Sequence, residues 1–128
     1  MRIGMTAPTL TGKGFTGNTI VTGPGAPTLL VFLAHWCQYC QRMKATTFKN
    51  QEIVDKLNSN FYFIDFNAEE KRDIKFDNQT FKYKPSGNNV GVHELALQLG
   101  TINNQIVYPV LCVLNEENEI ILQYNNYL

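Results

Sequence analysis

Residues 28–40 read TLLVFLAHWCQYC, so a run of apolar residues leads directly into two cysteines that are two residues apart. An uninterrupted apolar run is typical of a parallel strand that is covered on both faces of its sheet. From Gln38 to about Lys49 the apolar residues have the spacing of a helix with one face toward a core. A buried strand that ends in Cys-x-x-Cys and passes into a helix is typical of a dithiol redox centre.

The two cysteines, Cys37 and Cys40, are spaced for consecutive steps of one reaction. Cys37 falls at the start of the predicted helix, where unpaired backbone N–H groups and the helix dipole stabilise an anion. We therefore expect its thiolate to be the nucleophile. Cys40 lies about one helical turn further on, on the same face, where it can attack a mixed disulfide formed by Cys37.

Two other interpretations of this pair remain open, namely a static disulfide and one half of a zinc site. Zinc in proteins usually has four ligands, and the further candidates Cys112, His35 and His93 are scattered along the chain. We therefore expect no metal and no cofactor. Cys112 lies in an apolar run, where a free cysteine usually acts as a small hydrophobic residue.

Length and composition indicate one domain spanning residues 1–128. The 44% of hydrophobic residues are enough for a single core. Eleven basic and eleven acidic residues cancel, so charge gives no reason to expect nucleic acid or an anionic membrane as a partner. No apolar run is long enough to span a bilayer. The first eight residues lack the apolar segment of a secretory signal.

The other predicted elements alternate between strands and helices. Residues 1–27 form an extended arm or a short hairpin, with turns at the Gly-Asn and Gly-Pro-Gly sequences. Asn50 can cap a second helix. The remaining elements are a helix at 51–58, a strand at 61–67, a helix at 93–99 with Gly100 beyond its end, and a hairpin of strands 109–114 and 120–124. This order predicts an α/β domain with a mixed sheet flanked by helices.

Residues 68–91 form a long polar stretch between a strand and a helix. We expect strand pieces at 74–76 and 80–83, a loop at 85–89 and a solvated charged face at 69–73. Such a long insertion is either a partner-binding flap or an excursion that the fold tolerates.

The order of elements, together with Ala34-His35-Trp36-Cys37-x-x-Cys40, resembles the thioredoxin superfamily. The resemblance covers about 28–67 and 92–124, leaves out the insertion and implies a thioredoxin-like fold. Within the superfamily, residues 40–44 and 52–54 are most similar to two groups. These are small bacterial thioredoxin-like or disulfide-isomerase-like proteins, and the C-terminal domain of thiol:disulfide interchange proteins.

The resemblance implies a thiol:disulfide oxidoreductase that reduces or isomerises protein disulfides. We expect protein dithiol or disulfide substrates, an electron donor and a monomeric chain. The resemblance favours an extracytoplasmic location such as the periplasm, while a cytoplasmic one stays open. The alternative function is a redox-inactive module that uses the same fold to bind a protein partner or a metal.

Several residues around the motif acquire candidate roles from the resemblance. Pro109 is implied to follow a cis peptide bond and to face the disulfide, whereas its other interpretation is an ordinary edge-strand proline. Tyr108 is either a surface on which a substrate docks or a residue that only packs against its neighbours. His35 is either a solvated residue at the end of the strand or one that tunes the pKa of the Cys37 thiol. The candidates for substrate contact are Trp36, Gln38, Tyr39 and Tyr108.

The sequence departs from the family pattern where an acid is expected. Val31 stands six residues before Cys37, where thioredoxins commonly carry a buried acid that takes the proton of the resolving thiol. Asp65 lies in the next strand. It is either the acceptor of the Cys40 proton, with a pKa raised by burial, or an ordinary hydrogen-bonded aspartate. We also expect the final helix of the family to be absent, which would leave part of one sheet face uncovered unless the chain was cut or another element covers it.

Overall fold

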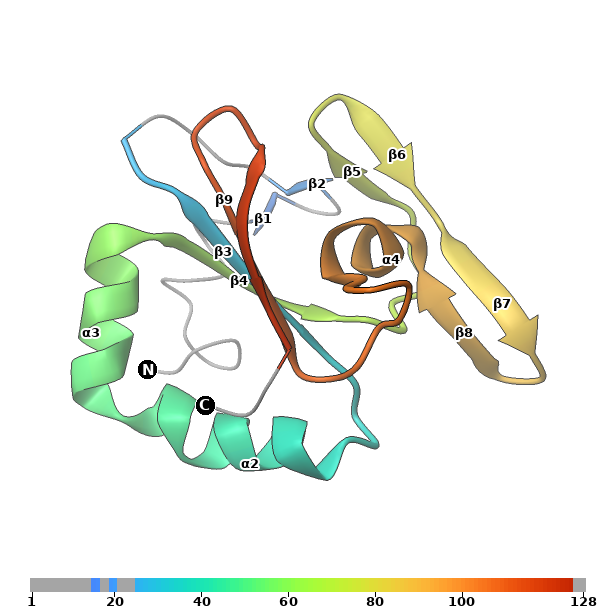
Figure 1. The fold of residues 1–128 in the computed structure, drawn as a ribbon, viewed down its shortest axis with the longest axis horizontal. Helices are drawn as coiled ribbons and strands as arrows, with labels where there is room; N and C mark the ends of the chain where they lie inside the picture. Colours follow the sequence, from blue (N-terminus) through green and yellow to red (C-terminus); the bar gives the residue numbers. More distant parts are fainter. Residues whose placement is uncertain (1–14, 17–18, 21–24, 126–128) are drawn as a thin grey trace.

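A four-stranded mixed sheet forms the centre of the computed structural model, which describes residues 15–16, 19–20 and 25–125 (Figure 1). β3 (Thr28–Leu33) runs parallel to β4 (Tyr62–Asn67) and antiparallel to β9 (Val110–Leu114). β10 (Ile120–Tyr124) pairs with β9 and forms one edge of the sheet. Every residue of β3 is buried, as its apolar sequence predicts.

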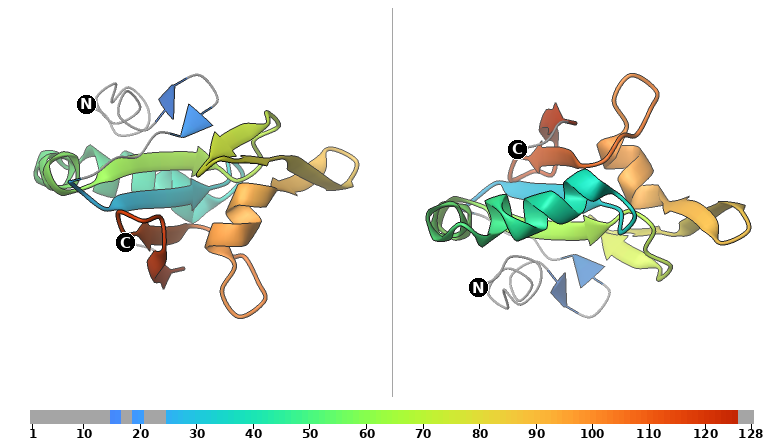
Figure 2. Two further views of the ribbon diagram at one scale, coloured as in Figure 1. Left: turned by 90° about the horizontal axis from the view of Figure 1, so that it is seen from above. Right: turned by 90° about the horizontal axis from the view of Figure 1, so that it is seen from below.

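Helices cover both faces of this sheet (Figure 2). α2 (Gln38–Ala45), the 3₁₀ helix η1 (Thr47–Lys49) and α3 (Gln51–Asn60) lie on one face. α4 (Glu94–Gly100) lies on the other face. Within the described part of the chain, the helices are too short and too polar to cross a bilayer.

The alternation of side chains along β3 divides the core into two clusters, because successive residues of a strand point to opposite faces. Val31 packs in the cluster that contains Met43 of α2 and Val54 of α3. Phe32 packs in the cluster that contains Leu95 of α4. The predicted central strand therefore packs against both helical layers. The residues that follow it are held at the C-terminal end of this strand.

The predicted helix from Gln38 to about Lys49 is interrupted at Thr46. The hydroxyl of this residue donates a hydrogen bond to the carbonyl of Arg42 at 2.7 Å, and its backbone has φ −118° and ψ −76°. Because its side chain bonds the preceding turn, α2 ends there and η1 follows. The predicted cap of the next helix is confirmed, since Asn50 accepts hydrogen bonds from the N–H groups of Glu52 and Ile53.

The stretch 68–91 contains more regular structure than the sequence predicts. It contributes two hairpins, whose strands are β5 (Ile74–Phe76), β6 (Gln79–Phe81), β7 (Tyr83–Gly87) and β8 (Val90–His93). The predicted loop at 85–89 is wrong, because Pro85 to Gly87 belong to β7 and only the two asparagines turn. Pro85 is tolerated there because β7 and β8 form a two-stranded sheet in which each strand has an open edge.

The N-terminal hairpin joins the first of these two hairpins in one sheet. β1 (Phe15–Thr16) and β2 (Thr19–Ile20) pair antiparallel, which confirms the hairpin interpretation for this part of 1–27. The rest of that segment up to residue 24 lies outside the described residues. Thr19 of β2 pairs in parallel with Lys75 of β5, so strands far apart in sequence form a second sheet in the order β1-β2-β5-β6.

The end of α4 differs from the prediction by one residue, because Gly100 closes the helix instead of following it. A Cβ at this position would lie 3.0 Å from Val110 and 3.1 Å from Ile106. Glycine therefore lets the helix end pack closely against the start of β9. On β10, the side chains of Ile121 and Leu122 are exposed. The expectation that the final helix of the family is absent concerns residues 126–128, which lie outside the described part of the chain.

Candidate active site

Cys37 occupies the N-cap of α2, at the point where the chain leaves β3. Its Sγ accepts a hydrogen bond from the backbone N–H of Cys40 at 3.2 Å. The same sulfur lies 3.7 Å from the carbonyl oxygen of Tyr108, to which the thiol donates. These two contacts fix the position of the Cys37 sulfur at the start of the helix.

Cys40 is fully buried and unoxidised, one turn into the same helix. Burial, together with its hydrogen bond to Cys37, raises the pKa of the Cys40 thiol to about 12. A hydrogen bond from the backbone at Ala34 and the positive charge of Lys44 act in the opposite direction. Cys40 therefore stays protonated at neutral pH until another group takes its proton.

Pro109 directly precedes β9, and the peptide bond between Tyr108 and Pro109 is cis. The cis bond is the one that the resemblance implies. The ring of Tyr108 packs edge-on against Trp36, with 5.7 Å between the ring centroids. The backbone and the side chain of Tyr108 thus lie against two consecutive residues of the motif, Trp36 and Cys37.

A shallow groove of about 420 Å³ runs beside Cys37. Its predicted members are Trp36, Gln38, Tyr39 and Tyr108, which the structure brings together around Cys37. Trp36 and Tyr39 are 60% and 56% exposed, so two aromatic faces are open to a substrate. Ile106 and Val107 complete the groove and were missed; two apolar residues directly before Tyr108 were the available signal.

Glu69 is a further residue that sequence reasoning missed. Its carboxylate accepts a hydrogen bond from Trp36 Nε1 at 3.1 Å, and its other oxygen lies 3.4 Å from His35 Nδ1. The expectation that 69–73 is a solvated face is wrong for this residue, whose side chain is only 23% exposed. The signal was its place just after β4, beside the end of the parallel strand β3.

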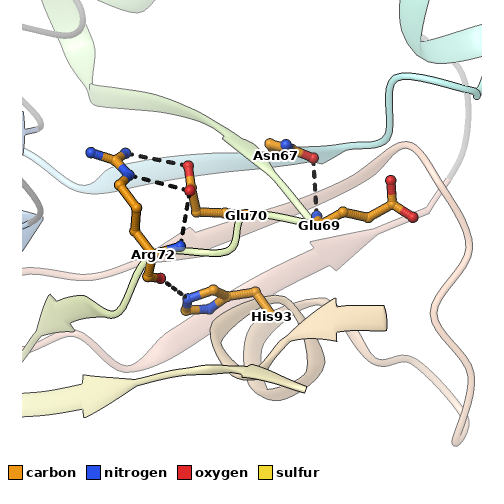
Figure 3. Close-up of polar contacts among 5 residues, drawn as sticks. All are labelled: Asn67, Glu69, Glu70, Arg72 and His93. Atoms are coloured by element: carbon orange, nitrogen blue, oxygen red, sulfur yellow. Dashed lines mark hydrogen bonds and ion pairs between the residues drawn. The ribbon is translucent and has the colours of Figure 1, made fainter. Parts of the chain in front are cut away.

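The loop that carries Glu69 is fixed by its own hydrogen bonds (Figure 3). Asn67 accepts from the Glu69 N–H at 3.0 Å, and Arg72 pairs with Glu70 at 3.2 Å. The buried ring of His93 accepts the N–H of Leu95 at Nδ1, so Nε2 carries the proton that it donates to the Arg72 carbonyl at 2.9 Å. These contacts hold Glu69 in place beside Trp36.

Asp65 lies on the α2 side of the sheet. It pairs in register with Val31, and Val31 belongs to the same buried cluster as Cys40. Burial raises the pKa of the Asp65 carboxyl, and the positive charge of Lys44 opposes this shift. Because Lys44 acts on both Asp65 and Cys40, the carboxyl and the Cys40 thiol share one electrostatic environment.

The other cysteine and the histidines are not gathered at this site. Cys112 packs in the cluster on the α4 side of the sheet, where burial raises its pKa to about 12. His93 is buried beside Phe66, away from His35 at the motif. Among the described residues, no group of three or more histidine, cysteine or acidic side chains is arranged to hold a metal ion.

Known proteins share this arrangement of elements. A family model described as a thioredoxin-like domain matches residues 19–123. A thioredoxin-fold protein from Helicobacter pylori superposes with a TM-score of 0.63 at 18% identity, over 93% of this chain and 70% of that one. No curated protein sequence matches significantly.

Two further solved structures are similar in fold. One is a disulphide isomerase from Xylella fastidiosa Temecula1, with a TM-score of 0.50 and 20% identity over 77% of this chain and 60% of that one. The other is an exposed lipoprotein thioredoxin from Streptococcus pneumoniae strain TIGR4, with a TM-score of 0.50 and 15% identity over 93% and 81%. At these identities the likeness concerns the fold.

Proposed function

The chain belongs to the family of thioredoxin-like domains, and we propose that it is a thiol:disulfide oxidoreductase that reduces or isomerises disulfides of protein substrates. The family and the Cys37–Cys40 pair support thiol–disulfide exchange as the class of reaction. The observation that carries the proposal is the position of Cys37 at the helix N-cap. Its sulfur is bonded to the Cys40 N–H at 3.2 Å and lies on the wall of an apolar groove.

The first step uses Cys37 as the nucleophile. Its thiolate attacks one sulfur of a substrate disulfide, a new S–S bond forms between Cys37 and that sulfur, and the old S–S bond breaks. The second substrate sulfur leaves as a thiolate and takes up a proton. The groove residues Trp36 and Tyr39 offer aromatic faces to the polypeptide on either side of the substrate cysteine.

The second step uses Cys40, and because burial is the largest cause of its raised pKa, its thiol needs a base to lose the proton. The carboxylate of Asp65 accepts its proton, and the Cys40 thiolate then attacks Cys37. The Cys37–Cys40 disulfide forms as the bond between Cys37 and the substrate breaks, and the remaining substrate sulfur leaves as a thiolate that takes up a proton, while Asp65 releases the one it accepted. The substrate has then gained two electrons and two protons, and an external dithiol returns the enzyme to its reduced form.

Isomerisation branches from the mixed disulfide. If another thiolate of the substrate attacks the substrate sulfur before Cys40 attacks Cys37, a new substrate disulfide forms and Cys37 leaves unchanged. Slow proton loss from Cys40 lengthens the life of the mixed disulfide. The high pKa of Cys40 therefore supports an isomerase branch beside the reductase branch.

An insulin-reduction assay with dithiothreitol tests the proposal. The reduced protein should accelerate precipitation of the insulin B chain, and Cys37→Ser should abolish the acceleration. Cys112→Ser is the matched control and should retain it, because Cys112 lies on the other side of the sheet. A wild-type protein that gives no acceleration would support the binding module instead.

A further inference from the structure

Two hollows adjoin the start of the motif. One is the apolar groove, which Trp36 and Cys37 line. The other is a polar hollow of about 360 Å³, lined by His35 of the motif, Glu69 of the loop after β4 and Tyr83 of β7. Glu69 contacts both His35 and Trp36, so the two hollows meet at these residues. The proposed function uses the first hollow and leaves the second without a role.

One wall of the polar hollow belongs to the stretch 68–91. The ring of Tyr83 lies against Gly91 of β8, where a Cβ would come within 2.5 Å of the tyrosine hydroxyl oxygen. Glycine at this position therefore leaves the space that the ring occupies. The ammonium group of Lys71 lies over the same ring, 5.8 Å from its centroid. The insertion thus contributes a packed wall beside the motif, which favours the flap interpretation over a tolerated excursion.

The carboxylate of Glu69 carries a charge that no lysine or arginine neutralises within the described part of the chain. The lysine and arginine ion pairs there involve other carboxylates, and the partners of Glu69 are the Trp36 indole and the His35 imidazole. Figure 3 shows its side chain directed away from Arg72, which pairs with Glu70. Because a carboxylate has about four acceptor positions, Glu69 can accept further hydrogen bonds.

We propose that Glu69 and the exposed face of Trp36 form a subsite for a lysine or arginine side chain of the protein substrate, close to the cysteine that Cys37 attacks. The inference rests on the proposed function. Trp36 is 60% exposed, so the methylene stem of a basic side chain can pack on the indole. The cation is attracted to the face of the ring and forms a charge-assisted hydrogen bond with the carboxylate.

The charges around the subsite favour a basic residue over an acidic one. The apolar groove has no charged residue in its lining, so it opposes neither charge. Lys71, which also lines the polar hollow, is held over Tyr83 and forms no ion pair with Glu69. An acidic side chain at the indole would meet the negative charge of Glu69. The substrate therefore carries its basic residue on the side of the polar hollow.

Matched peptide disulfides test the subsite. They differ in one residue, which is lysine, alanine or glutamate and stands two positions before or after the cysteine. Formation of the mixed disulfide with Cys37 is followed by rapid quenching, and the rate of each peptide with dithiothreitol corrects for the effect of charge on its own sulfur. At one of the two positions, we expect the lysine peptide to react roughly fivefold faster than the alanine peptide, the effect of one surface ion pair. The glutamate peptide should react more slowly than either, and salt at about 1 M should remove most of the preference.

Glu69→Gln separates the charge of Glu69 from its hydrogen bond, because the amide oxygen still accepts the indole N–H of Trp36. The fluorescence of Trp36 should therefore match wild type, while the lysine and glutamate peptides should react at equal corrected rates. Glu117→Gln is the matched control and should keep the wild-type preference. This residue lies in the turn between β9 and β10, at the opposite end of β9 from Pro109.

The outcomes separate this inference from the proposed function. Equal corrected rates for all three peptides with the wild-type protein would overturn the subsite, and so would a lysine preference that persists in Glu69→Gln. Neither result touches the proposed function, which the alanine peptide tests by itself. Failure of the wild-type protein to form a mixed disulfide with any of the peptides would overturn the proposed function, and the subsite with it.

Discussion

Val31 and Asp65 lie opposite each other in register on the parallel strands β3 and β4. Val31 occupies the position where the family pattern has an acid, and Asp65 brings a carboxyl to the neighbouring strand at the same level. Val31 is fully buried in the cluster that contains Cys40. In our proposal, the carboxyl that takes the proton of the resolving thiol therefore lies on β4, beside the position on β3 where the family pattern has it.

Asp65→Asn should slow the resolving step at neutral pH by roughly a hundredfold or more, because it removes a general base. Burial raises the pKa of Asp65 above 3.8. The wild-type rate should therefore rise with pH as the carboxyl ionises, and this limb of the profile should be missing in the variant. Quenched release assays from pH 4 to pH 9 would show it. Asp55→Asn, on the exposed face of α3, is the control and should behave as wild type. If the pH profile of Asp65→Asn is identical to that of wild type, Asp65 is not the base.

The same substitution should change stability with a defined sign. A raised carboxyl pKa means that the folded state holds the proton more tightly than the unfolded state. Stability conferred by protonated Asp65 is therefore present at low pH and is lost as pH rises from 3.8 through the raised value. At neutral pH, Asp65→Asn should gain on the order of 1 kcal/mol over wild type. Urea unfolding at both ends of this range would measure it, and a less stable variant at neutral pH would contradict the assignment.

Glu69→Ala should loosen Trp36 in the groove. Trp36 is the single tryptophan of the chain, so its fluorescence reports on the active site directly. The alanine variant should shift the emission and raise KM by roughly a few fold, since one hydrogen bond of about 1 kcal/mol is lost. Glu69→Gln keeps an acceptor oxygen for the indole and should stay near wild type. Equal fluorescence in all three proteins would show that Glu69 does not hold Trp36.

Cys112 should be inert in the native protein. It is fully buried, and its pKa of about 12 leaves almost no thiolate at pH 8. Iodoacetamide should therefore modify Cys37 in the folded, reduced chain and reach Cys112 only after unfolding. Peptide mapping by mass spectrometry would locate the label. Labelling of native Cys112 as fast as Cys37 would contradict its place in the core.

The features that could be predicted from sequence are those decided by local chemistry. The apolar run forms β3. Cys37 and Asn50 lie at the starts of two helices, where their side chains accept hydrogen bonds from backbone N–H groups. The cis peptide bond follows Tyr108, as the resemblance implies. For the strand and the two helix starts, the residues that decide the structure are close together in sequence, whereas the cis bond was expected from the resemblance alone. Short-range signals therefore sufficed for the reaction class.

The features that sequence missed depend on contacts between distant segments. Glu69 reaches Trp36 because β3 and β4 end side by side, a signal that emerges only when the two predicted strands are paired with each other. Pro85 and Gly87 disfavour a strand locally, yet β8 supplies the partner that makes β7. The tyrosine before the cis bond was identified, but its unpaired hydroxyl depends on packing and could only be seen in the structure.

The central claim is that Cys37 attacks a disulfide, and trapping with Cys40→Ala tests it most directly. Alanine keeps the backbone N–H that bonds the Cys37 sulfur and removes the resolving thiol. Incubated with a peptide disulfide, this variant should accumulate one covalent adduct, mapped by mass spectrometry to Cys37. An adduct on Cys112, or no adduct while the variant remains folded, would contradict the account.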